Sequence, residues 1–196
     1  MAIFVTKESA PLYDLLIKHQ SGELPCKIPC IISNHEHLKE IAEQFNIPFF
    51  YLPVAPERKD EQEKEIREII EKEKIDLLVL ARYMQILSSA FVTEYQGRII
   101  NIHHGFLPAF KGNNPYRKAW ERGVKMIGAT AHYVTADLDE GPIIEQDVVS
   151  VNHQHSVKEM VQAGRDIERR VLTSAVKAHL EHRIILDGRR TIIFHS

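Results

Sequence analysis

Short apolar runs alternate with amphipathic stretches over the first half of the chain. The apolar runs have the length of strands, and the fourth is almost continuously hydrophobic, which is typical of a strand buried on both faces. The stretches between them carry apolar residues at helical spacing. The predicted strands are 2–6, 27–33, 47–52 and 75–81, and the predicted helices are 11–20, 35–45 and 57–74. Strands and helices that alternate with short connections predict a parallel sheet with right-handed crossovers.

The pattern changes in the second half, where the predicted strands become longer. After a short helix at 88–95, the expected elements are strands 98–103, 128–134 and 143–151, a helix from 156 to 181, and a hairpin of 183–186 with 191–194. The hairpin turns at Asp187-Gly188. No internal repeat, low-complexity tract or linker interrupts this order. We therefore expect a single α/β domain over residues 1–196, with a mostly parallel central sheet flanked by helices.

Two local features of the predicted helices lead to further expectations. Asn34 stands directly before the helix predicted at 35–45, and it is a residue type that caps helix N-termini. The helix predicted at 57–74 carries a long run of charges, while Ile66, Ile69 and Ile70 share its other side. We interpret the charge run as a solvated face rather than an acidic binding surface.

The composition excludes several classes of partner. Of the 196 residues, 44% are hydrophobic and 27% are charged, and the formal net charge is −2. A nucleic-acid or anionic-membrane partner would need a clustered basic face, which is missing. No apolar run approaches the roughly 18 residues that span a bilayer. We expect a cytoplasmic protein with a small-molecule substrate, no nucleic acid and no membrane partner, and leave open whether it forms a homo-oligomer.

The cysteines and histidines do not suggest a metal site. Cys26 and Cys30 are too few for a disulfide framework, and we interpret them as small buried hydrophobic residues. We do not interpret His104, His132, His153 and His155 as ligands of a metal site. His132 alternates with Ala131 and Tyr133 on a strand, and we interpret it as a packed, hydrogen-bonded side chain.

Chemically unusual side chains follow two of the predicted strands. Asn101 and His103 lie at the end of strand 98–103, and residues two apart in an extended chain point to the same side. An amide N–H beside an imidazole can stabilise a developing oxyanion. Ligands of open α/β sheets bind outside the carboxyl ends of the strands, so this pair is a candidate site. Taken alone, a strand-end Asn and His are more often structural.

Asp139 is the third candidate. The Gly141-Pro142 pair forces a turn before the next strand, which puts Asp139 on a loop beside the sheet. Its simpler interpretation is a carboxylate that bonds only the backbone of its own turn.

Taken together, these segments resemble the folate-dependent formyltransferase family. The motifs that carry the resemblance are Asn101-x-His103 followed by Leu107-Pro108, the run 128–135 and the run 138–144. The resemblance covers essentially the whole chain and implies a Rossmann-like formyltransferase fold over 1–196. Four further stretches, 21–25, 32–35, 80–88 and 122–132, resemble the hydrolytic branch of the family, the deformylases, without their N-terminal ACT domain.

The resemblance implies the roles of specific residues. Asn101, His103 and Asp139 match the catalytic residues of the family. Asn101 would donate to the formyl oxygen, His103 as imidazolium would stabilise the oxyanion or supply a proton, and Asp139 would favour charged His103 and orient a water. The pterin of the folate would lie in a cleft, held largely by backbone groups. The matching residues are Met84, Gln85, Ile86, Leu87, Val134, Thr135, Ala136, Asp137 and Leu138.

The resemblance also implies the reaction. It is hydrolysis of 10-formyltetrahydrofolate to formate and tetrahydrofolate, which would supply formate to one-carbon and purine metabolism, with no permanently bound cofactor and no metal. Transferases of the family carry a glycine-rich loop after the first strand, which cradles a substrate phosphate with backbone N–H groups. In this chain the corresponding residues, 6–11, include no glycine, and Pro11 lacks a backbone N–H that could donate to a phosphate. Water is therefore the expected acceptor.

Two alternatives remain open from the sequence. One is formyl transfer to an amine acceptor, as in phosphoribosylglycinamide formyltransferases, and the other is a non-catalytic folate-binding homologue. Ala10, Pro11 and Gly105 depart from the deformylase pattern, which usually has His-Cys and Ser at these places. We also expect a loop at 111–115 over the cleft.

Overall fold

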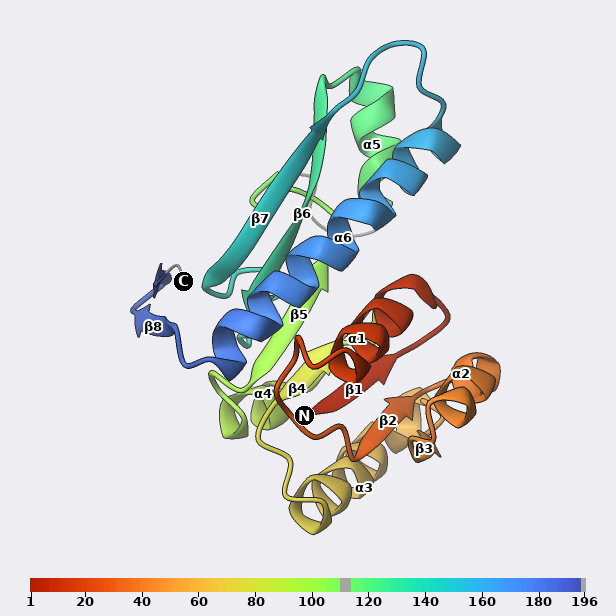
Figure 1. Ribbon diagram of the computed structural model, residues 1–196, viewed down its shortest axis with the longest axis vertical. Helices are drawn as coiled ribbons and strands as arrows, with labels where there is room; N and C mark the ends of the chain where they lie inside the picture. Colours follow the sequence, from red (N-terminus) through yellow and green to blue (C-terminus); the bar gives the residue numbers. More distant parts are fainter. Residues whose placement is uncertain (110–113, 195–196) are drawn as a thin grey trace. The chain divides into compact units, whose positions relative to one another are not determined.

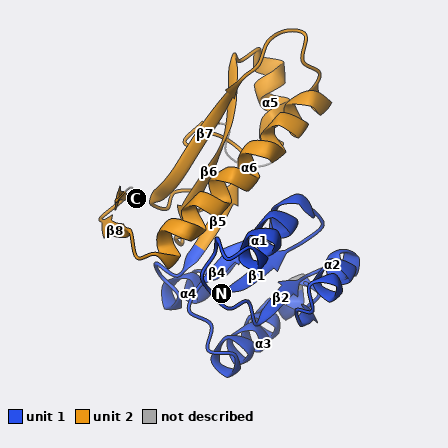
Figure 2. Ribbon diagram, viewed as in Figure 1, with its two compact units in different colours: residues 1–99 blue, residues 100–196 orange. Residues whose placement is uncertain are grey.

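The computed structural model describes residues 1–109 and 114–194 and divides into two compact units (Figures 1 and 2). The first unit comprises residues 1–99 and the second residues 100–196. The single domain expected over 1–196 stays a prediction. Most of the loop expected at 111–115, namely 111–113, lies outside the described residues.

In the first unit, parallel strands alternate with helices, as the hydrophobic pattern predicts. The strand order is β3-β2-β1-β4, and β1 pairs in parallel with both β2 and β4. The elements are β1 (Ala2–Val5), α1 (Ala10–Gln20), β2 (Cys30–Ser33), η1 (Glu36–Leu38), α2 (Lys39–Gln44), β3 (Phe49–Tyr51), η2 (Pro56–Arg58), α3 (Lys59–Lys72), β4 (Leu78–Leu80) and α4 (Ser89–Glu94). The strands β1, β2 and β4 are buried along their whole length, so their apolar runs form the core of this unit.

The prediction that Asn34 caps a helix is wrong. The chain continues after His35 with the 3-10 turn η1 and then with α2, and His35 is the N-cap residue. The Asn34 carboxamide oxygen instead accepts a hydrogen bond of 2.8 Å from the Thr6 hydroxyl. Val5 and Ser33 are register partners of the parallel pair β1–β2, so the next residues along each strand meet.

The interpretation of the α3 charges as a solvated face is also incomplete. Gln62 and Glu63 are buried, with relative exposures of 7% and 3%. The Gln62 amide donates to the Leu52 carbonyl at 2.6 Å, and Glu63 accepts from Ser88. A charged side chain is buried only where hydrogen bonds replace its lost hydration, and Glu63 meets that condition.

In the second unit, an antiparallel sheet packs against one long helix. The order β5-β6-β7 is antiparallel, and α6 lies along β6 and β7 (Figure 1). The elements are β5 (Ile99–His103), α5 (Pro115–Arg122), β6 (Met126–Tyr133), β7 (Ile143–Ser150), α6 (Val157–Leu180), β8 (Ile184–Asp187) and β9 (Arg190–Ile193). A capping box of Ser156 and Glu159 begins α6, and β8–β9 is the expected hairpin.

The structure also bears on the expectations about the cysteines and about membrane-spanning segments. Both cysteines are free; Cys30 is buried, as expected, but Cys26 is only half-buried. None of the helices in the described ranges 1–109 and 114–194 is long and apolar enough to cross a membrane.

Candidate active site

Four polar side chains come together on one face of the strand pair β5–β6. In the antiparallel register Asn101 lies opposite His132, and His103 lies opposite Thr130. Because side chains two residues apart in a strand share a face, and partners directly opposite share it too, all four residues belong to the same face. His103, Thr130 and His132 are buried there, and Asn101 is half-buried.

The contact expected between His103 and Asp139 is present. His103 Nδ1 lies 3.3 Å from Asp139 Oδ2, and both side chains are almost fully buried, with exposures of 5% and 9%. This arrangement uses Nδ1 as the donor to the carboxylate. Within the described residues, the other ring nitrogen, Nε2, is buried without a hydrogen-bond partner. The histidine is therefore oriented by Asp139, and its Nε2 makes no hydrogen bond to another described residue.

The loop that carries Asp139 is held by a close backbone approach. Asp139 adopts a left-handed conformation with φ of 56°, which aspartate tolerates better than most residues. A Cβ atom at Gly141 would lie only 1.7 Å from the Tyr133 carbonyl oxygen. Tyr133 N donates to the Pro142 carbonyl at 2.9 Å, which closes the loop onto the end of β6. Glycine at 141 is therefore required to bring Asp139 back to the strand pair.

His132 is the functional candidate that sequence reasoning missed. It is packed and hydrogen-bonded, as interpreted, but its partners are the catalytic candidates. Its Nδ1 lies 2.9 Å from the Tyr133 carbonyl, so this nitrogen carries a proton and donates it. Its Nε2 lies 3.3 Å from Asn101 Nδ2, which donates in turn. This contact thus fixes the orientation of the Asn101 amide, with its nitrogen towards His132.

Burial determines the charges in this cluster. Burial lowers the pKa of His132, and it outweighs the raising effects of the Tyr133 carbonyl and Asp139. The 3.8 Å approach of His132 Nε2 to Asp139 Oδ1 is therefore a contact with a neutral imidazole and not an ion pair. The hydrogen bond from His103 lowers the pKa of Asp139, although burial opposes it. Asp139 is an ionised carboxylate beside a neutral His132.

A buried network fixes the loop that follows β5. The Thr130 hydroxyl donates to the Gly105 carbonyl at 2.9 Å and accepts from Leu107 N at 3.0 Å. The Gln146 amide donates to the Leu107 carbonyl, also at 2.9 Å. A Cβ atom at Gly105 would lie 3.0 Å from His103 Nε2, so the loop passes directly beside the free nitrogen of the imidazole.

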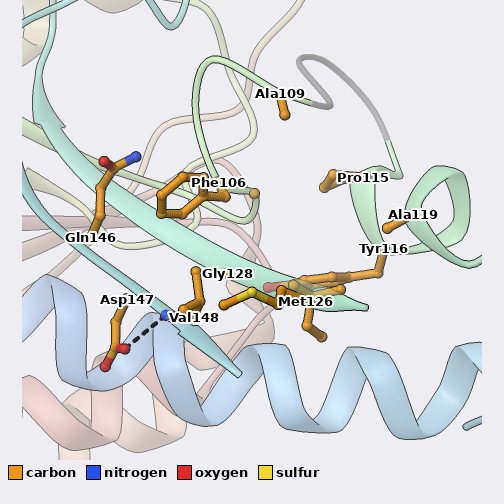
Figure 3. Close-up of a pocket in the computed structure, with 12 residues that line it drawn as sticks. Phe106, Ala109, Pro115, Tyr116, Ala119, Met126, Gly128, Gln146, Asp147 and Val148 are labelled. Carbon is orange, nitrogen blue, oxygen red and sulfur yellow. Dashed lines mark hydrogen bonds between the residues drawn. The ribbon is translucent and has the colours of Figure 1, made fainter. Parts of the chain in front are cut away.

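A pocket of about 490 Å³ opens beside this loop (Figure 3). Its lining is mainly apolar and includes Gly105 and Phe106 from the loop, Tyr116 and Ala119 from α5, and Met126 and Val148 from β6 and β7. Asp139 is not among its lining residues. His103 is not among them either, so the pocket adjoins the loop at Gly105 without being lined by the pair of His103 and Asp139.

The residues expected to hold the folate are divided between the two units. Met84, Gln85, Ile86 and Leu87 belong to the first unit, and Val134, Thr135, Ala136, Asp137 and Leu138 belong to the second. Both segments are irregular backbone, and Met84, Ile86 and Leu138 expose large apolar side chains. The folate cleft stays a prediction. In the described ranges 1–109 and 114–194, no group of three or more His, Cys, Asp or Glu side chains could hold a metal ion.

Two histidines, the buried His132 and the half-buried His179, predict a pH dependence of stability. The pKa values of His132 and His179 are lowered in the folded protein, so the unfolded chain binds more protons below about pH 6.5. Their contribution is present above that pH and is lost as the pH falls towards their folded pKa values. We expect the free energy of unfolding to fall between pH 7 and pH 5, by up to about 1.4 kcal/mol per pH unit for each histidine. Urea unfolding at several pH values measures this slope.

The matching variant is His132→Gln, which removes one of the two titrating groups. We expect it to be less stable than the wild type at pH 7 and to show a shallower slope below it. A slope unchanged from that of the wild type would show that His132 is not held neutral.

A family model described as formyl transferase matches residues 1–176. The chain belongs to this family. Two relatives named formyltetrahydrofolate deformylase are similar to it over almost its whole length. The protein from Synechocystis is 55% identical over 99% of this chain, which corresponds to 68% of that protein. The protein from Bacillus subtilis is 52% identical over 100% of this chain, which corresponds to 65% of that protein. The chain thus spans about two thirds of the length of these relatives.

Solved structures give the same picture of the fold. A formyltetrahydrofolate deformylase from Pseudomonas syringae matches 99% of this chain and 65% of its own, with a TM-score of 0.96 and 47% identity. A glycinamide ribonucleotide transformylase from Symbiobacterium toebii matches 99% of this chain and 93% of its own, with a TM-score of 0.93 and 30% identity. The expected α/β formyltransferase fold, with a mostly parallel central sheet, a long C-terminal helix and a hairpin, is confirmed.

Proposed function

We propose that this chain hydrolyses 10-formyltetrahydrofolate to formate and tetrahydrofolate, without a permanently bound cofactor. Two findings support the hydrolytic branch of the family. The named relatives at 52% and 55% identity are deformylases, whereas the transformylase structure is 30% identical. The observation that carries the chemistry is the buried pair of His103 and Asp139 on the face that also holds Asn101.

In this mechanism Asn101 and His103 stabilise the formyl oxygen, and their other hydrogen bonds already hold both side chains in place. One N–H of the Asn101 amide points to His132, and the second N–H donates to the formyl oxygen. His103 Nδ1 is engaged by Asp139, so Nε2 is the nitrogen that meets the substrate, and as imidazolium it donates to the developing oxyanion. Donors oriented before the reaction stabilise the transition state without reorganisation.

In this mechanism the two carboxylate oxygens of Asp139 have separate roles. Oδ2 accepts from His103, and Oδ1 faces the neutral His132 Nε2, which has no proton to give it. Oδ1 is therefore available to accept a proton from the attacking water and to orient it. The water oxygen bonds to the formyl carbon as one of its protons passes to Asp139, the bond from that carbon to N10 breaks, and His103 gives N10 its proton. The second water proton leaves the resulting formic acid as it becomes formate. The products are formate and tetrahydrofolate.

The end of β1 supports water rather than a nucleotide as the acceptor. Ser9, the N-cap residue of α1, makes no side-chain capping bond, and a proline occupies the first turn. The stretch contains no glycine, so it lacks the loop that lets backbone N–H groups surround a phosphate.

We place the reaction in the cytoplasm, and assembly into a homo-oligomer stays a prediction.

The test is an acceptor competition. The purified protein is incubated with 10-formyltetrahydrofolate, with and without glycinamide ribonucleotide, and formate and formylglycinamide ribonucleotide are quantified together. We expect formate at the same rate in both reactions. Formyl transfer that is faster than formate release would assign the chain to the transferases, and no turnover of either kind would leave a folate-binding homologue.

A further inference from the structure

The segment 84–87 in the first unit combines irregular backbone with exposed apolar side chains. Met84 and Ile86 expose 49% and 66% of their surfaces, while Tyr83 directly before them is 5% exposed. The Tyr83 ring packs edge-on against Phe4 of β1 at 5.4 Å. Exposed apolar side chains that gather on a fixed segment indicate a binding surface rather than a part of the core.

The first residue of this segment is held by Thr6, which directly follows β1. Met84 N donates to the Thr6 hydroxyl oxygen at 3.0 Å, and the same hydroxyl donates to Asn34 at 2.8 Å. Thr6 and Asn34 are each 7% exposed. Because Asn34 takes the hydroxyl proton, a lone pair of the Thr6 oxygen is directed at the Met84 amide.

The far end of the segment is held by Glu63 from α3. Ser88 N donates to Glu63 Oε1 at 2.7 Å, and the Ser88 hydroxyl donates to Glu63 Oε2. The same hydroxyl accepts from Phe91 N at 3.1 Å and so caps α4. Glu63 is 3% exposed, and hydrogen bonds to a charged acceptor are the stronger kind.

We propose that Thr6 and Glu63 are positioning residues that hold the 84–87 backbone in the geometry that binds the folate. This inference rests on the proposed function and assigns it two residues that touch neither the substrate nor the reacting atoms. A site built from backbone groups cannot adjust by changing rotamers, so its affinity depends on how the backbone is fixed at both ends. Holding it before binding removes an ordering cost that the ligand would otherwise have to offset.

The contacts of Thr6 also explain the role of the residue that directly follows β1. In this chain the side chain there turns to Asn34 and Met84, within the same unit. The end of β1 thus serves the folate segment instead of an acceptor phosphate.

The experiment compares Thr6→Val, which keeps the shape and removes both hydrogen bonds, with Thr6→Ser, which keeps the hydroxyl. Tetrahydrofolate binding is measured by titration calorimetry, and KM and kcat for 10-formyltetrahydrofolate by formate release. For Thr6→Val we expect Kd and KM to rise by about tenfold, from the loss of a buried hydrogen bond, with kcat within about threefold of wild type. Thr6→Ser should restore most of the affinity. Thr93→Val, at an exposed threonine of α4, is the matched control and should bind like the wild type.

A purely structural role would give a different pattern. If Thr6→Val lowers the melting temperature but leaves Kd and KM unchanged, the proposal is overturned. Glu63→Gln provides the same test from the other end, should Thr6→Val fail to fold, because an NH2 donor replaces one of the two oxygens that accept from Ser88. Since tetrahydrofolate binding is measured without turnover, absence of formate from the wild type would overturn the proposed hydrolysis alone. An unchanged Kd in Thr6→Val, or in Glu63→Gln where Thr6→Val does not fold, would overturn the positioning role alone.

Discussion

Asp139→Asn is expected to lower kcat by about two to four orders of magnitude, the usual effect of losing general acid–base help. The substitution keeps the size and hydrogen-bonding shape of the side chain and removes its charge. Oδ2 then no longer accepts from His103 as a carboxylate, and no charged oxygen remains to take a proton from the water. The Kd for tetrahydrofolate should change little, because the folate is expected to be held by backbone groups of 84–87 and 134–138, which the substitution leaves in place. A falling kcat with near-constant affinity marks an interaction made in the transition state.

The matched control is Asp166→Asn, at an exposed aspartate of α6 that pairs with Arg169. It should turn over like the wild type. If Asp139 only shaped its own turn, asparagine would replace it well. A near-wild-type rate for Asp139→Asn would therefore remove Asp139 from the mechanism.

Asn101→Leu is the second substitution with a large expected effect. Leucine has a similar size but no donor, so the formyl oxygen loses one of its two stabilising groups. Removal of a single oxyanion donor costs about 10²–10³ in kcat. The His132 Nε2 acceptor also loses its partner, so some loss of stability is expected.

Two measurements separate these effects on Asn101→Leu. The kcat, from formate release at saturating substrate, reports the oxyanion interaction, and the urea midpoint reports the loss of the contact with His132. A kcat within about threefold of wild type, together with a lowered midpoint, would make Asn101 a structural residue and would contradict its assignment as an oxyanion donor.

The fold could be predicted from the sequence because its strong signals are local. The strands β1 and β4 are short apolar runs, and the Ser156–Glu159 capping box marks the start of α6 directly. The family followed from motifs that stand close together in the sequence, and the comparisons confirm it. The contact between His103 and Asp139, expected from the motif, is present, while the catalytic roles stay predictions.

The features that were missed depend on contacts between distant parts of the chain. His132 meets Asn101 only because of the antiparallel register of β5 and β6, which no local pattern encodes. By its residue type Asn34 could cap a helix, but its side chain instead accepts from the Thr6 hydroxyl, 28 positions away in the sequence. Glu63 stands in a charged helix, and its burial follows from a serine 25 positions further along. Polar residues with alternative partners are where local reasoning is weakest.

Isotopic labelling tests the central claim, hydrolysis by water, most directly. A turnover of 10-formyltetrahydrofolate in water enriched in ¹⁸O is followed by mass spectrometry of the released formate. Attack by water predicts one ¹⁸O atom per formate, beside the original formyl oxygen, and a signal that falls in parallel with kcat in Asp139→Asn. Formate without label, or label incorporation at an equal rate in Asp139→Asn, would contradict the account.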